Sequence, residues 1–105
     1  MAEKIDVIIK RVGQVPYRTS ISNTLENLQK HVNGYIEAVG IAGDAVIIVN
    51  EEGKIRDDIP YNCDLMGDHI FGTIIFAGVK KNGDFADYPT DFQTFKKRFP
   101  KLWQV

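Results

Sequence analysis

The sequence has one cysteine, Cys63, so it cannot form an internal disulfide. It also has no run of 18 apolar residues, which argues against a membrane-spanning helix and against a membrane partner. The N-terminal stretch MAEKIDVIIKR is not typical of a signal peptide, because Glu3 and Asp6 interrupt it and its apolar stretch is too short. We therefore expect the protein to work in a reducing compartment, the cytoplasm.

A surplus of positive charge is missing too. The sequence has 13 Lys and Arg against 14 Asp and Glu, which argues against duplex nucleic acid as a partner, since phosphate binding rests on such a surplus. His31 and His69 are far apart in sequence and do not form a metal-ligand spacing with the lone cysteine. There is no Walker loop and no GxGxxG pattern. The sequence thus predicts no metal site and no cofactor.

What the chain does have is enough apolar material for one core. Its 105 residues suit one domain, predicted to span residues 1–105. Hydrophobic residues make up 44% of the sequence and charged residues 26%, which is close to an ordinary globular composition. The sequence therefore predicts a folded domain without a linker.

Residues 34–54 are the most clearly patterned part of the chain. Side chains alternate over residues 35–41 as in a half-exposed strand. Residues 45–49 are all apolar, which is typical of a strand covered on both faces. Glycine in the turn at 42–44 permits a hairpin, and the pattern after the second run predicts a type I turn that closes with Gly53 at positive φ.

Further strands are predicted on both sides of this hairpin. They lie at residues 5–12, 15–20, 70–79 and 85–88, with a short extension of the hairpin at 54–56 and a loop at 57–69 that holds at most one helical turn at 63–66. Gly72 and Gly78 inside the strand at 70–79 indicate a bend, a bulge or a close backbone neighbour.

A first helix is predicted before the central hairpin. Asn23 can cap its start, with Glu26 three residues later as in a capping box. Its apolar stripe consists of Leu25, Leu28 and Val32. The pair Asn33-Gly34 is expected to end it.

A second helix is predicted near the C-terminus, beginning at Thr90 with Gln93 as its capping-box partner. Phe92, Phe95 and Phe99 form its apolar face, cations at residues 96–98 form its last turn, and Pro100 ends it. Together these elements predict an α+β fold with a mainly antiparallel sheet of five to six strands and two helices, in the order β-β-α-β-β-β-β-α.

Four motifs occur in sequence: GYIE at residues 34–37, VNEEGK at 49–54, Pro-x-Asn at 60–62, and Asp-x-Ile-x-Gly-Thr at 68–73. This combination resembles a family of small uncharacterised proteins of phages and mobile elements, over roughly residues 5–99. Many members of that family have Arg after the Pro-x-Asn, where this chain has Cys63. The resemblance implies a context, a phage or mobile element in a bacterial host, and no activity.

Polar residues at the ends of the strong strands are the candidate ligand-binding or partner-binding residues. They are Tyr35, Glu37, Asn50, Glu51, Asn62, Asp68 and Thr73. In one interpretation Asn50, Glu51, Asn62 and Asp68 converge on a small polar pocket. In the other, Asn50 and Asn62 satisfy backbone groups of turns, which is a common use of asparagine and the favoured interpretation.

The leading hypothesis for function is a small non-enzymatic protein that binds a host or phage protein or a small ligand, with sequestration of a nucleotide defence signal as one form. A small hydrolase using Glu51 or Asp68 is an alternative, although no base is positioned for Cys63 or a serine. A nucleic-acid-binding module is another, using the cations at 96–98 with Trp103. We also expect a homodimer or a larger homo-oligomer, because two helices lying on one face would leave apolar sheet exposed. The alternative is a curled sheet whose open side is closed by Leu102 and Trp103 within one chain.

Overall fold

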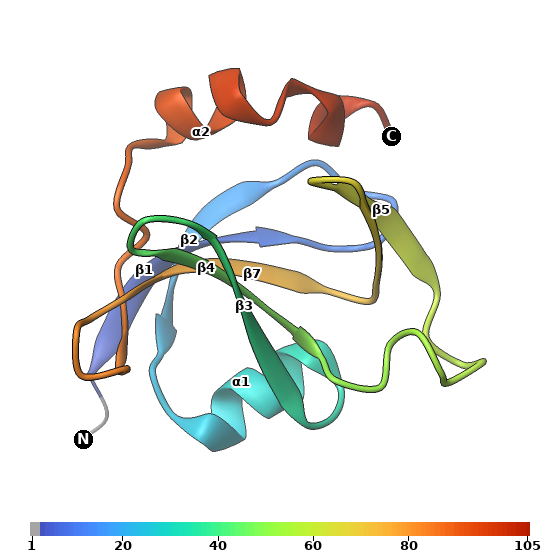
Figure 1. The fold of residues 1–105 in the computed structure, drawn as a ribbon, viewed down its shortest axis with the longest axis horizontal. Coiled ribbons are helices and arrows are strands. Elements are labelled where there is room, and N and C mark those ends of the chain that lie inside the picture. Colours follow the sequence, from blue (N-terminus) through green and yellow to red (C-terminus); the bar gives the residue numbers. More distant parts are fainter. Residues whose placement is uncertain (1–2) are drawn as a thin grey trace.

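The computed structural model describes residues 3–105 and consists of an antiparallel sheet with helices on both faces (Figure 1). In chain order the elements are β1 (Lys4–Lys10), β2 (Tyr17–Ser22), α1 (Leu25–Val32), β3 (Ile36–Ala42), β4 (Ala45–Asn50), β5 (Tyr61–Leu65), β6 (Asp68–Phe71), β7 (Ile74–Val79), β8 (Phe85–Ala86), α2 (Phe92–Arg98) and the 3₁₀ helix η1 (Pro100–Trp103). The predicted α+β class is confirmed. No helix in this described part is long and apolar enough to cross a membrane.

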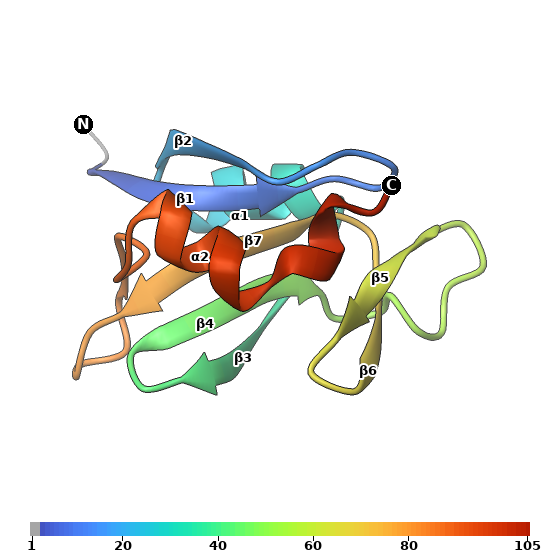
Figure 2. The same ribbon diagram turned by 90° about the horizontal axis from the view of Figure 1, so that it is seen from above.

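The main sheet has the strand order β2-β1-β7-β4-β3, and β8 pairs with the end of β7. Every neighbouring pair is antiparallel. The strands β5 and β6 form a separate hairpin beside this sheet (Figure 2). The sheet therefore has β2 and β3 as its two edges, while β4 and β7 are central.

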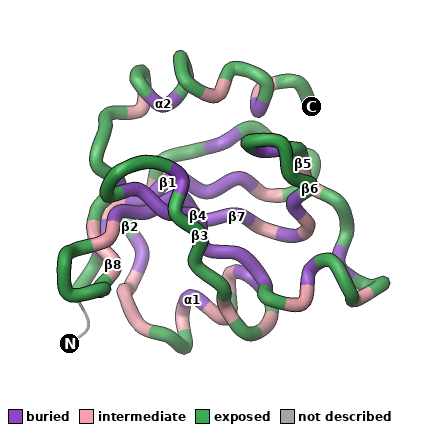
Figure 3. The backbone as a smooth tube through the Cα atoms, in the orientation of Figure 1, coloured by how far each residue is buried: buried purple, intermediate pink, exposed green. Residues whose placement is uncertain are grey.

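Two hydrophobic clusters lie on opposite faces of the sheet, because successive side chains of β4 and β7 alternate between the faces. The helix α1 packs on one face through Leu28 and Val32. On the other face Phe95 of α2, Leu102 of η1 and Leu65 of the β5–β6 hairpin pack together. All six residues of β4 are buried, as predicted for residues 45–49 (Figure 3).

The covered faces remove the reason for expecting a homodimer. That expectation assumed both helices on one face, and this premise is wrong, since α1 and α2 lie on opposite sides (Figure 1). The strongly apolar strands are covered within one chain. Leu102 and Trp103 fold back onto the body, with Leu102 buried in the core.

The main correction concerns residues 57–71. The predicted loop contains β5, there is no helical turn at 63–66, and the predicted strand at 70–79 is two strands, β6 and β7. Met66 and Gly67, both at positive φ, form the turn between β5 and β6. Gly72 has a φ of 78°, and this bend separates β6 from β7.

Turn chemistry also differs around β4. Gly53 is buried and does not have positive φ, so the predicted left-handed glycine is wrong; its amide still donates to the carbonyl of Asn50, as a turn requires. A β-carbon at Gly53 would lie 3.3 Å from the Asn50 carbonyl oxygen and from Phe71. Residues 54–56 belong to turns and loop and do not extend the hairpin.

Both predicted helix caps are displaced by one residue. Thr24, and not Asn23, caps α1 by accepting from the amide of Asn27, and Asp91, and not Thr90, caps α2. In each case the true cap has extended backbone and a side-chain oxygen within reach of the third amide. Leu25 lies 60% exposed at the start of α1, so the predicted apolar stripe is shorter by one residue.

Candidate binding cleft

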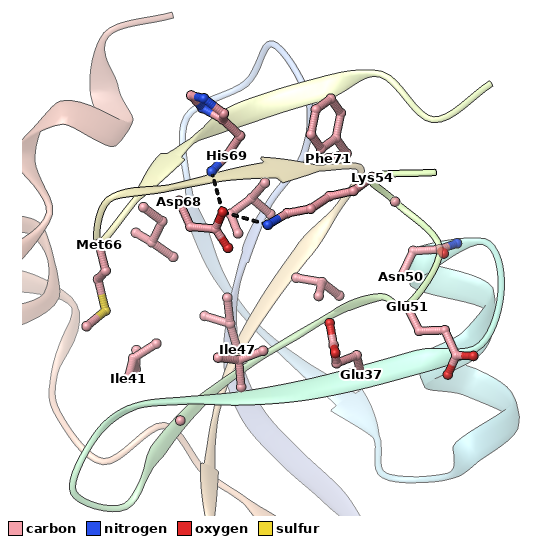
Figure 4. Close-up of a pocket in the computed structure, with 16 residues that line it drawn as sticks. Glu37, Ile41, Ile47, Asn50, Glu51, Lys54, Met66, Asp68, His69 and Phe71 are labelled. Atoms are coloured by element: carbon pink, nitrogen blue, oxygen red, sulfur yellow. Dashed lines mark hydrogen bonds and ion pairs between the residues drawn. The ribbon is translucent and has the colours of Figure 1, made fainter. Parts of the chain in front are cut away.

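A cleft of about 540 Å³ lies between β3–β4 and the β5–β6 hairpin (Figure 4). It opens on the sheet face that α2 also covers, since its floor belongs to the same hydrophobic cluster. The residues that line it are Glu37, Val39, Gly40, Ile41, Ile47, Val49, Asn50, Glu51, Gly53, Lys54, Leu65, Met66, Asp68, His69, Ile70 and Phe71.

The floor of the cleft is apolar. It consists of Ile41, Ile47, Val49, Leu65 and Ile70, none of which is more than 8% exposed. These side chains are held by the sheet and the hairpin, so the floor is preformed. Met66 extends from the hairpin turn toward Ile41 (Figure 4) and is largely exposed. An apolar group entering between them would lose contact with water on several sides.

The rim of the cleft carries more negative than positive charge. Glu37, Glu51 and Asp68 supply three carboxylates against one ammonium, that of Lys54. Lys54 Nζ lies 2.6 Å from Asp68 Oδ1 and is already paired. This partner holds the pKa of Asp68 below its usual value, chiefly through the hydrogen bond from Lys54.

Two of the rim carboxylates have no such partner. Within residues 3–105, the side chains of Glu37 and Glu51 make no hydrogen bond or ion pair. Figure 4 shows Glu37 pointing from β3 toward the hairpin, on the side where Lys54 and Asp68 lie. The cleft therefore combines an apolar floor with uncompensated negative charge.

Asn50 forms one end of the cleft and is only 4% exposed. Its amide nitrogen donates to the carbonyls of Val32 and Asn33, each at 3.1 Å, and its oxygen accepts from the amide of Glu52 at 2.7 Å. The backbone of Gly34 lies so close to this side chain that a β-carbon at residue 34 would come within 2.6 Å of Asn50 Nδ2. The favoured structural interpretation of Asn50 fits these contacts.

Asn62 lies away from the cleft, beside a buried cation. Its amide nitrogen donates to the carbonyls of Lys10 (2.9 Å) and Gly72 (2.7 Å), and its oxygen accepts from Lys10 Nζ at 3.0 Å. Lys10 is 1% exposed, and burial lowers its pKa. These bonds fasten the start of β5 to the end of β1, so Asn62 also has a structural role.

Three of the seven predicted site residues thus lie outside the cleft. Tyr35 is exposed just before β3, Thr73 is half-buried in the bend between β6 and β7, and Asn62 bonds to Lys10. The other four, Glu37, Asn50, Glu51 and Asp68, line it. The structure therefore brings Asn50, Glu51 and Asp68 to one cleft and places Asn62 elsewhere.

Residues 5–100 match DUF3846, a domain of unknown function. The chain belongs to this family. No curated protein and no solved structure matches the chain.

Sequence reasoning missed the wall of the cleft in this DUF3846 domain. Lys54, Met66, His69 and Phe71 line it and were not among the predicted residues. Lys54 belongs to the turns after β4, Met66 and His69 to the segment predicted as a loop, and Phe71 to the strand predicted at 70–79. The one local signal was Met66-Gly67, where glycine favours a tight turn between two short runs.

A second polar cluster lies on the hairpin of the DUF3846 domain. Asp64 accepts from the Tyr61 hydroxyl at 2.7 Å and pairs with His69, and these contacts lower the pKa of Asp64, with His69 as the larger cause. Asp64 and His69 are 60% and 72% exposed, so water surrounds this cluster. Within residues 3–105, no group of three or more His, Cys, Asp and Glu is placed to hold a metal ion.

Proposed function

We propose that this DUF3846 domain is a small non-enzymatic binding protein of a phage or mobile element. In this proposal the cleft holds an apolar group that carries a positive charge, supplied by a host or phage protein in the bacterial cytoplasm. The observation that carries the proposal is the apolar floor beneath a rim with three carboxylates and one paired lysine. The motifs at residues 34–73 that resemble phage and mobile-element proteins support the context.

The chemistry of the rim favours a cation over an anion. A positive group beside Glu37 gains attraction without breaking an existing ion pair, because Glu37 has none among the described residues. The Lys54–Asp68 pair is more than half exposed on both sides, so it contributes little stability and can rearrange at low cost. The stem of a lysine or arginine side chain can cover the apolar floor while its charged end reaches the rim.

Sequestration of a nucleotide signal receives less support from the same rim. A phosphate would approach Glu37, Glu51 and Asp68, and the nearest lysine is engaged with Asp68. Anion sites in proteins instead gather cations or free amide groups. The proposal therefore places a basic partner group, and not a nucleotide, in the cleft.

The hydrolase alternative lacks an activated nucleophile. Burial raises the pKa of the Cys63 thiol, so the less reactive protonated form dominates at neutral pH. Asp68 is tied to Lys54, and Cys63 does not line the cleft.

The nucleic-acid alternative is weakened by the packing of the C-terminal segment. Trp103 is half-buried against Phe92 and Phe95, with ring centroids 5.8 and 6.1 Å away. Lys96 lies over the Trp103 ring at 5.4 Å. An indole used in this way offers little free face for stacking a base.

The test is a titration of isotope-labelled protein followed by amide resonances. Hexylammonium is the cationic probe, and hexanoate and a cyclic dinucleotide are its controls at equal concentration. We expect hexylammonium to shift the amides of Glu37, Ile47 and Ile70, with weaker binding to Glu37→Gln. Binding to Glu26→Gln should be unchanged, because Glu26 is exposed on α1, away from the cleft. Stronger shifts of these amides with hexanoate or the dinucleotide would overturn the proposal.

A further inference from the structure

The outer edge of β3 is unpaired along most of its length. β3 is the last strand of the sheet order, and within residues 3–105 only β4 pairs with it. The amide of Glu51 donates to the carbonyl of Tyr35, so these two residues form a hydrogen-bonded pair of the β3–β4 ladder. Because bonded pairs alternate in an antiparallel ladder, the backbone groups that point away from the sheet belong to Ile36, Ala38 and Gly40.

Over residues 36–40 this edge lacks the lysine and the proline that often protect an edge strand. The seven residues of β3, IEAVGIA, include one charge and neither lysine nor proline. Most of them are exposed, with Val39 at 42% (Figure 3). The other edge, β2, follows Pro16 and carries Arg18, which pairs with Asp6. The β3 edge is therefore better suited than the β2 edge to pair with another strand.

The free part of the edge has a defined end. The register between β3 and β4 shifts between Gly40 and Ala42, and Arg98 of α2 donates to the carbonyl of Ile41 at 3.3 Å. A bulge and an occupied carbonyl stop further pairing at this point. The segment open to a partner is therefore short, residues 36–40.

The side chains of this segment connect the edge to the cleft. Glu37 and Val39 both line the cleft, so their side chains point to its side of the sheet; Figure 4 shows this for Glu37. A strand added beside β3 would place every second side chain next to them, at the mouth of the cleft.

We propose that the β3 edge binds an extended segment of a partner protein by strand addition, with a basic side chain next to Glu37 and an apolar side chain next to Val39. This mode of binding rests on the proposed function, since the basic and apolar side chains of the partner segment are the groups that enter the cleft. Charge complementarity selects the occupant: the rim has three carboxylates against one paired ammonium. A second copy fits less well, because its own β3 offers no basic residue.

The experiment uses the synthetic peptide acetyl-Thr-Val-Thr-Lys-Thr-Val-Thr-amide, in which valine flanks lysine at the same spacing in either strand direction. Affinity is measured by calorimetry, and hydrogen exchange reports on the amides of Ile36, Ala38 and Gly40. We expect these three amides to exchange more slowly in the complex. The same peptide with glutamate in place of lysine is expected to bind about tenfold more weakly or worse, since like charges then face each other.

Two further probes test the backbone contribution. Ala38→Pro removes an amide that points outward from β3 and is expected to abolish peptide binding. Ser20→Pro, its counterpart on the β2 edge, is expected to leave peptide binding unchanged. The register between β1 and β2 and the hydrogen bond from the Asn23 amide to the Glu3 carbonyl show that the backbone groups of Ser20 also point outward. Two more peptides are tested with the wild-type protein, one N-methylated on the threonines and the other on the lysine and valines. Only one of the two should lose affinity, because alternate residues of an added strand direct their amides toward β3. Equal binding of both peptides would overturn strand addition.

Failure of this inference is distinguishable from failure of the proposed function. If the peptide does not bind but hexylammonium still shifts the cleft amides, strand addition is wrong and the cation-binding cleft stands. If neither probe binds, both are wrong. If the protein alone is a dimer that Ala38→Pro converts to a monomer, the occupant is a second copy and the proposed basic partner is wrong.

Discussion

The side chain of Asn50 joins two segments that the sheet does not itself connect, the end of α1 and the turn after β4. All three of its hydrogen bonds go to backbone groups. Alanine would leave two carbonyls and one amide without this partner in a site that is nearly closed to water. The asparagine therefore supports the end of the cleft by fixing the turn that carries Glu51 and Lys54.

Asn50→Ala is expected to lower the free energy of unfolding by about 1–3 kcal/mol, the cost of leaving buried polar groups unsatisfied. Glu52→Ala is the control, since the Glu52 side chain makes no hydrogen bond within the described residues and its amide is kept. Urea unfolding of both variants gives the comparison. Equal losses in the two variants would contradict the structural role of Asn50.

His31 on α1 gives the protein a pH-dependent contact. Its Nδ1 lies 3.2 Å from Nη2 of Arg11, and only the neutral ring can accept a hydrogen bond from that guanidinium. Burial, and then the charge of Arg11, lower the pKa of His31 below its usual value. The unfolded chain therefore binds this proton more readily than the folded chain, so His31 makes unfolding easier as the pH falls.

His31→Gln is expected to flatten the loss of stability as the pH falls below about 6.5, the ordinary pKa of histidine, because there the unfolded chain binds the proton before the folded chain does. Above that value both states are neutral and the difference between the proteins should be constant. Arg11→Gln, which keeps the ring but removes the neighbouring cation, should show an intermediate slope. Unfolding measured across this range in all three proteins is the test, and the same slope in wild type and His31→Gln would refute the assignment.

The elements that sequence alone predicts well are those whose pattern and packing agree. Residues 45–49 are apolar throughout, and β4 is buried on both faces. The helices follow their apolar spacing, with Phe95 fully buried in α2. Their caps were displaced by one residue because neighbouring residues, Asn23 and Thr24 for instance, both carry a suitable oxygen, and only the backbone conformation selects between them.

The β5–β6 hairpin was not predictable from local pattern. β5 reads YNCDL with mixed burial, so the alternation of a half-buried strand is absent. Its position is instead fixed by contacts distant in sequence, such as the bonds between Asn62 and Lys10. Lys10 itself could not be recognised as buried, because a lysine in an alternating strand usually marks the exposed face. Since the hairpin forms one wall of the cleft, missing it also hid half of the site.

Gly72 is the bend that allows the hairpin to leave the sheet. It has a φ of 78°, and a β-carbon there would lie 3.0 Å from Cγ2 of the buried Ile59. Gly72→Ala should therefore cost the left-handed backbone penalty, about 1–2 kcal/mol, plus this crowding. Gly83→Ala is the matched control, because Gly83 has a φ of 93° and open space around it. Denaturation should show the larger loss for Gly72→Ala; equal losses would mean that Ile59 moves aside freely.

The molecule as a whole covers both faces of its sheet with its own segments. α1 closes one face, and α2, η1 and the hairpin close most of the other. On this second face the cleft between the hairpin and β3 stays open, beside the unpaired outer edge of β3. The apolar surface that would drive obligate dimerisation is therefore already buried, and the open features suit a partner that brings positive charge.

The oligomeric state in solution follows from this distribution of surface. We expect light scattering at micromolar concentration to give a mass near 11.9 kDa, that of one chain. Self-pairing through β3 would bring two copies of an acidic cleft together without supplying a cation, so it gains less than pairing with a basic segment. A mass near twice this value that persists in Ala38→Pro would place a dimer interface elsewhere, and would revive the homodimer on different grounds from the exposed sheet face first expected.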